Sequence, residues 1–94
     1  MNTKHKPQDE PVNINELPQQ RAADYLSTYS NHVEVGFSPW DLRILFFEIT
    51  EDEKGDIIRE KKARVVMSPQ HAMAFSQVLN NTIEKWAKEH ASEQ

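Results

Sequence analysis

Residues 42–49 read Leu-Arg-Ile-Leu-Phe-Phe-Glu-Ile and form the most apolar run of the chain. Alternate side chains of a β-strand point to opposite faces of its sheet. Both faces of this run are apolar: Leu42, Ile44 and Phe46 on one, and Leu45, Phe47 and Ile49 on the other. A strand of this kind requires cover on both faces, so the run predicts a central strand.

Two further strands are expected on either side of this run. Residues 25–37 alternate between apolar and polar side chains, most clearly over residues 32–37, and a turn at residues 38–41 follows them. After the central strand, a charged loop with Gly55 leads to a third strand over residues 57–67. This order predicts an antiparallel meander of three strands.

A helix is predicted directly after the third strand. Ser68 is a preferred N-cap residue, and Pro69 is favoured at the first helical position. Helical spacing then continues to about residue 90 through an apolar stripe: Phe75, Val78, Leu79, Ile83 and Trp86. The expected fold is therefore α+β, a three-stranded antiparallel meander followed by one long C-terminal helix that packs on one face of the sheet.

The chain is short and polar. It has 94 residues, of which 37% are hydrophobic and 28% are charged, which leaves room for a single domain. Residues 1–21 contain three prolines and lack apolar periodicity, so we expect a disordered arm there. Residues 22–94 are then the folded domain.

One helix on a small sheet gives a thin core, and this predicts a homodimer. A helix of about 22 residues is about 33 Å long, so its last turns should extend beyond the sheet. The second face of the central strand also needs cover, either from another subunit or from the N-terminal arm. The expected dimer contacts are therefore Leu45, Phe47, Ile49, Ile83 and Trp86.

The turn Ser38-Pro39-Trp40-Asp41 is the best candidate for a binding site. Proline fixes φ at the second position of a turn, so the side chains of the turn are pre-organised. Trp40 either folds back over the end of the sheet or remains exposed as an anchor for a protein partner, since Trp is enriched at binding hot spots. The expected partner-binding residues are Ser38, Trp40, Asp41 and Arg43.

Composition argues against several other classes of protein. The net charge of −4 disfavours non-specific nucleic-acid binding, although basic residues do cluster within residues 57–64, interleaved with acids. There is no cysteine, the four histidines lack ligand spacing, and two glycines cannot form a phosphate-binding loop. We expect no metal, no cofactor and no enzymatic activity.

The chain also lacks the marks of export or membrane insertion. Its first residues are polar, and no stretch approaches 18 apolar residues. This predicts no membrane contact and a cytoplasmic location.

Two motifs resemble the DUF3467 family. They are YSNHVEVGFSPWD at residues 29–41 and ARVVMSPQHA at residues 63–72, and the resemblance extends over about residues 29–86. The family is one of small bacterial proteins of unknown function, so the resemblance implies a domain and no catalytic residue.

The sequence thus favours a small non-enzymatic homodimeric protein-interaction module of unknown pathway, which binds its partner through the Trp40 turn or the disordered arm. The alternative is a nucleic-acid- or nucleotide-binding regulator that uses the basic strand at residues 57–64. Loss of affinity in moderate salt would distinguish the alternative, because phosphate binding depends steeply on salt.

Overall fold

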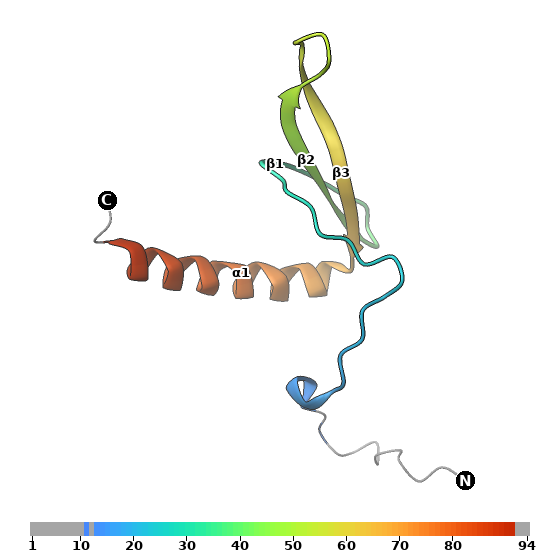
Figure 1. The fold of residues 1–94 in the computed structure, drawn as a ribbon. Helices are drawn as coiled ribbons and strands as arrows, with labels where there is room; N and C mark the ends of the chain where they lie inside the picture. The colour runs from blue at the N-terminus through green and yellow to red at the C-terminus, as the bar shows by residue number, and fades with distance from the viewer. Residues whose placement is uncertain (1–10, 12, 92–94) are drawn as a thin grey trace.

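The computed structural model of the chain describes residue 11 and residues 13–91. The elements follow in the order η1 (Ile14–Glu16), β1 (His32–Phe37), β2 (Leu42–Glu51), β3 (Ile57–Met67) and α1 (Pro69–His90) (Figure 1). A three-stranded antiparallel sheet followed by one long helix confirms the predicted α+β fold.

The sheet has two faces of different character. Its strand order is β1-β2-β3 with both pairs antiparallel, and the register aligns Val33 with Phe46 and Ile44 with Val65. One face, here called the apolar face, carries Val33, Val35, Phe37, Leu42, Ile44, Phe46, Ala63, Val65 and Met67. The opposite face, here called the mixed face, carries His32, Glu34, Arg43, Leu45, Phe47, Arg64 and Val66.

A β-bulge interrupts the β2–β3 ladder. Phe46 is aligned with Ala63 and Phe47 with Lys61, so Lys62 is the extra residue on β3. The Lys62 amine lies 3.5 Å from Glu48 Oε1 and 3.8 Å from Glu60 Oε1. The sequence pattern did not indicate the bulge, because a single inserted residue in a charged strand leaves no mark on hydrophobic periodicity.

The loop between β2 and β3 is closed by one aspartate. Asp52 Oδ1 accepts hydrogen bonds from the backbone N–H groups of Lys54 and Asp56, each at 2.9 Å. Gly55 has a φ of 87°, a conformation that side chains disfavour. This confirms the expected turn role of the glycine.

The helix begins as expected but does not pack on its own sheet. Ser68 Oγ accepts a hydrogen bond from the backbone N–H of His71 at 3.1 Å, and Pro69 follows at the first helical position. From there α1 projects away from the base of β3, as Figure 1 shows, and no helical residue is buried. The expected packing of the helix on one face of the sheet is therefore wrong for the single chain.

The connection between β3 and α1 explains this departure. Only Ser68 separates Met67 from Pro69, whereas most connections between elements take several residues. Ser68 is extended, with φ −68° and ψ 155°, as expected for a residue before proline. A single extended residue cannot reverse the chain, so the helix leaves the sheet at a steep angle.

The chain has little hydrophobic core. Among the described residues, Ile44 and Phe47 are the buried hydrophobic side chains. The radius of gyration is 19.0 Å, whereas a compact domain of this length has about 12 Å. The sequence predicts a thin core made by one helix on a small sheet. The observed core is smaller still, because the helix does not pack on the sheet.

Among the described residues before β1, η1 is the one element of regular structure. The disordered arm expected over residues 1–21 lies partly outside the described residues, since residues 1–10 and 12 are not described. Residues 13–29 are exposed, and η1 is their single helical turn, capped by Asn13. The alternation over residues 25–31 does not form a strand, because β1 begins at His32.

Candidate functional site

The turn between β1 and β2 is held by the side chain of Ser38. Its Oγ accepts hydrogen bonds from the backbone N–H groups of Trp40 at 3.1 Å and Asp41 at 3.2 Å, and donates one to Asp41 Oδ1 at 3.1 Å. The backbone N–H of Ser38 also donates to the Asp41 carbonyl at 2.9 Å. Together with Pro39, these bonds fix the backbone that carries Trp40.

Two aromatic side chains stand free at this end of the sheet. Trp40 is 81% exposed, and Phe37, the last residue of β1, is 79% exposed. Trp40 therefore does not seal the end of the sheet in the single chain. Exposed aromatic groups on a rigid backbone are typical of binding surfaces, because little conformational entropy is lost when they are buried.

The other two residues expected at this site lie beside the turn. Arg43 Nε is 3.8 Å from Asp41 Oδ1, too long for a hydrogen bond. Arg43 Nε is buried, and no described group hydrogen-bonds it. The structure thus brings Ser38, Asp41 and Arg43 together, with Trp40 projecting from the same turn.

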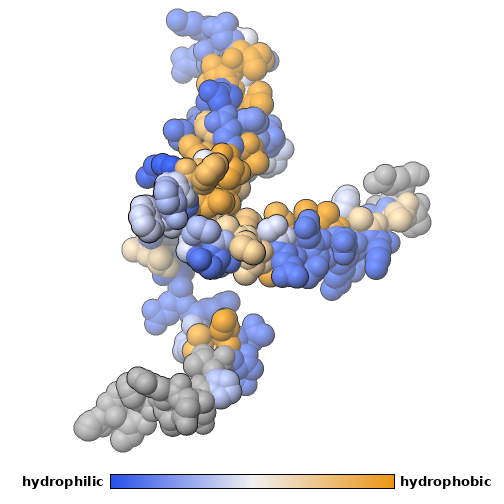
Figure 2. Space-filling view, turned by 180° about the vertical axis from the view of Figure 1, so that it is seen from behind, coloured by the Kyte–Doolittle hydropathy of each residue, from blue (hydrophilic) through white to orange (hydrophobic). Residues whose placement is uncertain are grey.

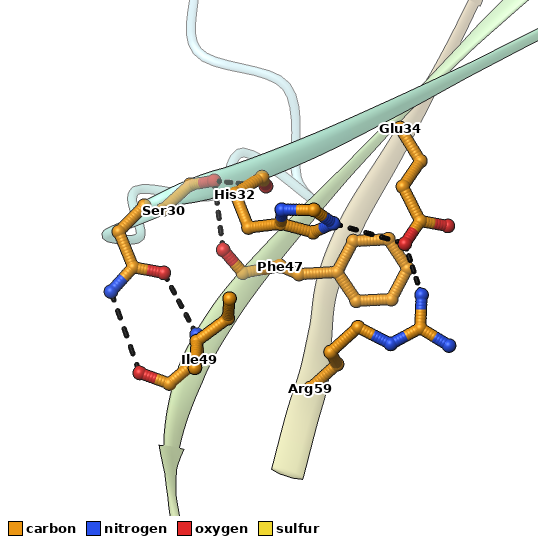
Figure 3. A network of polar contacts seen from close by, with 7 residues as sticks. Ser30, His32, Glu34, Phe47, Ile49 and Arg59 are labelled. Carbon is orange, nitrogen blue, oxygen red and sulfur yellow. Dashed lines mark hydrogen bonds and ion pairs between the residues drawn. The ribbon is translucent and has the colours of Figure 1, made fainter. Parts of the chain in front are cut away.

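A network of polar side chains lies on the mixed face of the sheet (Figure 3). Glu34 is its centre: its Oε2 lies 3.0 Å from His32 Nε2 and also pairs with Arg59 of β3. Ser30 Oγ donates to the Phe47 carbonyl at 3.0 Å. The network joins β1 to β2 and β3 at the end of the sheet opposite the Ser38 turn.

The network also covers the ring of Phe47. The His32 ring lies 5.7 Å from it, and Arg59 and Lys61 lie over it at 5.4 and 5.9 Å. Phe47 is therefore 5% exposed. Its own chain thus covers Phe47, and the expected contact of Phe47 with a second copy stays a prediction.

The network lowers the pKa of the Glu34 carboxyl. The hydrogen bond from His32 is the largest cause, and partial desolvation opposes it. The hydrogen bond and positive charge of Arg59 lower the pKa further. Glu34 therefore stays ionised in the folded chain at pH values where an isolated glutamate begins to take up a proton.

An exposed apolar surface lies on the opposite side of the sheet. Val33, Val35, Phe37 and Val65 of the apolar face are all exposed. A groove of about 580 Å³ has walls from Val33, Val35, Ile44 and Phe46 on the sheet, and from Phe75 and Leu79 on the helix. A second groove of about 540 Å³ lies where residues 26–30 run beside Phe46, Ala63 and Val65.

The apolar stripe of α1 continues beyond this groove. In Figure 2 the apolar side of the helix lies along its upper edge, towards the side on which the sheet rises. Ile83 and Trp86 extend the stripe past Leu79 and are exposed. Ile83 and Trp86 therefore lie exposed beyond the groove, on a helix that does not pack on the sheet as expected, and their contact with a second copy stays a prediction.

The remaining residues of the expected dimer contact are less accessible than the helix. Leu45 is half-buried on the mixed face, and Ile49 is partly exposed. The sequence analysis did not identify the apolar face as the exposed face of the sheet. The alternation of apolar side chains at Val33, Val35 and Phe37 already indicated an apolar surface there. That face was instead assigned to the chain's own helix, which the single-residue connection at Ser68 prevents.

The described residues also bear on metal binding and on membrane insertion. Among residue 11 and residues 13–91, no group of three or more His, Asp or Glu side chains is arranged to hold a metal. Within the same residues, no helix has both the length and the hydropathy to cross a bilayer.

Comparison with known proteins gives a single assignment. Residues 1–92 match the family described as "Protein of unknown function (DUF3467)", a longer stretch than the two motifs had indicated. No curated protein and no solved structure matches the chain.

Proposed function

The chain belongs to the DUF3467 family, and we propose that it is a non-enzymatic, homodimeric interaction module that presents Trp40 to a protein partner. The observation that carries this proposal is the 81% exposure of Trp40 on a turn fixed by Ser38.

The geometry of the turn supports an anchor role. Exposed apolar residues that lie close together, unlike single ones, are typical of interaction sites. Here Phe37 and Trp40 are both exposed within four residues of each other, next to the charges of Asp41 and Arg43. An aromatic centre with a polar rim is the usual anatomy of a protein-binding surface.

A dimer would present this turn twice. In a two-fold assembly each copy carries the same surface patch. Two linked turns then bind a partner with two sites more tightly than one turn does, because the second contact is intramolecular. This supports an adaptor rather than a simple one-to-one binder.

No observation favours the alternative of a phosphate-binding strand over this proposal. Arg59 is paired with Glu34, and Arg59 and Lys61 both lie over Phe47. Lys62 is paired with Glu48 and Glu60. These three cations of the basic strand are already engaged within the chain.

Capture from the native cell under cross-linking tests the proposal. The full chain, its Trp40→Ala variant and a Met73→Ala control serve as bait; Met73 is also large, apolar and exposed, but lies on the helix. We expect the wild type and the control to retain the same specific partner, and Trp40→Ala to lose it at unchanged melting temperature. Retention of every partner by Trp40→Ala would refute the anchor role.

A further inference from the structure

We propose that two copies assemble by exchanging helices, so that the outer half of α1 of each copy packs on the apolar face of the other. This inference rests on the proposed homodimer and specifies its interface. The proposed interface includes the apolar face. The mixed face, which carries Phe47, is not part of this interface.

The first support is the amount of uncovered surface. The chain exposes 8985 Å², whereas a compact monomer of its mass exposes about 5,600 Å². Part of the excess lies on the exposed residues 13–29. The stripe of α1 and the apolar face carry further exposed side chains, among them Val33, Val35, Ile83 and Trp86. An obligate dimer buries about 1,000–2,500 Å² on each copy.

The second support is the connection at Ser68. Because Ser68 alone joins Met67 to Pro69, α1 cannot turn back to lie over the sheet from which it emerges. Short connections of this kind favour exchange of an element between copies, since the element finds the same surface on a neighbour.

The third support is the match between the two open surfaces. An amphipathic helix and an apolar sheet face are the two layers of an α+β core. The stripe of α1 flanks the sheet only at Phe75 and Leu79, while Ile83 and Trp86 lie beyond it. A second copy, related by two-fold symmetry, covers those outer residues with its own apolar face.

A second copy fits the apolar face, because the exposed stripe of α1 on one copy and the apolar face of the other copy can cover each other. Among the described residues, the stripe of α1 and the part of the apolar face around Val33, Val35 and Phe37 are exposed, although Ile44 of the same face is buried. Exchange covers both exposed surfaces. An unrelated partner would have to supply both a helix and a sheet face. The exchange also fills the groove of about 580 Å³ between Val35 and Leu79.

Two valines of equal exposure on opposite faces give a matched test. Val33 on the apolar face and Val66 on the mixed face are each 49% exposed in the single chain. In sedimentation equilibrium we expect Val33→Asp to raise the dimer dissociation constant about 100-fold or more, because it buries an unpaired charge. Val66→Asp should leave the dissociation constant within about threefold of wild type.

Cross-linking tests the interface even if Val33→Asp fails to fold. The chain has no cysteine, so introduced thiols react without background. Copies carrying Val33→Cys and Ile83→Cys, with different tags, are co-expressed and treated with a short bismaleimide. We expect a covalent heterodimer from this pair and none from Val66→Cys with Ile83→Cys.

The outcomes separate the two proposals. A dimer that dissociates with Val66→Asp but not with Val33→Asp, or that cross-links through Val66, overturns helix exchange and leaves the homodimer standing. A wild-type chain that sediments as a folded species of 11.0 kDa at micromolar concentration overturns both.

Discussion

The guanidinium of Arg59 lies over the ring of Phe47, 5.4 Å from its centre. Arg59 holds this position by pairing with Glu34 on the far strand of the sheet. A cation over an aromatic face, with its charge balanced by a carboxylate, covers the ring without exposing apolar surface. The mixed face therefore needs no partner at Phe47, and the apolar face is left as the open one.

The stability of the chain should fall in acid through Glu34. Its pKa in the folded chain lies below the unfolded value of 4.5, so the ionised form stabilises the fold. That contribution is present above pH 4.5 and is lost as the pH falls through the folded pKa. Melting temperatures followed by circular dichroism from about pH 6 to pH 3 should show the loss.

Replacing the carboxyl removes this dependence. Glu34→Gln should melt lower than wild type at neutral pH and lose less on acidification, because the amide does not titrate. Glu84→Gln, on the exposed helix, is the control and should follow the wild-type profile. An acid profile of Glu34→Gln with the wild-type slope would show that another group governs the transition.

The two aromatic residues Phe47 and Trp40 should differ sharply in their effect on stability. Phe47 is 5% exposed, so Phe47→Ala should lower the free energy of unfolding by about 3–5 kcal/mol. Trp40→Ala should change it by no more than about 0.5 kcal/mol. Urea denaturation at one fixed protein concentration measures both, since the stability of a dimer depends on concentration.

A large loss from Trp40→Ala would contradict this expectation. It would mean that Trp40 is buried in the assembled protein, either by the chain's own dimer or by a rearranged turn. Sedimentation of the same variant would then show whether the dimer depends on it.

Removal of the Ser38 hydroxyl should loosen the turn without unfolding the sheet. Ser38→Ala loses two hydrogen bonds that its Oγ accepts and one that it donates, at a cost of about 0.5–1.5 kcal/mol. Partner affinity should fall as well, because Trp40 is less ordered before binding. Ser27→Ala, at an exposed position, is the control for both readouts; equal effects of the two changes would argue against a special role for Ser38.

Lengthening the connection between β3 and α1 should convert the dimer to a monomer. Five residues, Gly-Ser-Gly-Ser-Gly, inserted between Met67 and Ser68 would allow the helix to fold back on its own sheet. We expect this variant to sediment as one copy, with a smaller radius of gyration in X-ray scattering than the 19.0 Å of the single chain described here.

The same insert in the β2–β3 loop is the control for this prediction. Placed between Glu53 and Lys54, which are exposed in that loop, it should leave the dimer intact. A lengthened connection that still gives a stable dimer would contradict the role assigned to Ser68.

Local features of the candidate site could be anticipated from sequence. Residues close together in the sequence determine both the Ser38-Pro39-Trp40-Asp41 turn and the exposed, charged part of β3. The network of His32, Glu34 and Arg59 could not be anticipated, because Glu34 and Arg59 are 25 positions apart. The bulge at Lys62 was equally hidden, although it sets which side chains of β3 share a face with Phe47.

The sequence by itself determined the elements of this protein. Alternation defined β1, an apolar run defined β2, and Ser68-Pro69 set the start of α1, because these signals depend on a residue and its near neighbours. Only the tertiary structure decided which face of the sheet is covered. Phe47 is buried by side chains from β1 and β3, while Ile83 and Trp86 stay exposed. Burial depends on where elements lie in space, and here one extended residue, Ser68, directs the helix away from its own sheet.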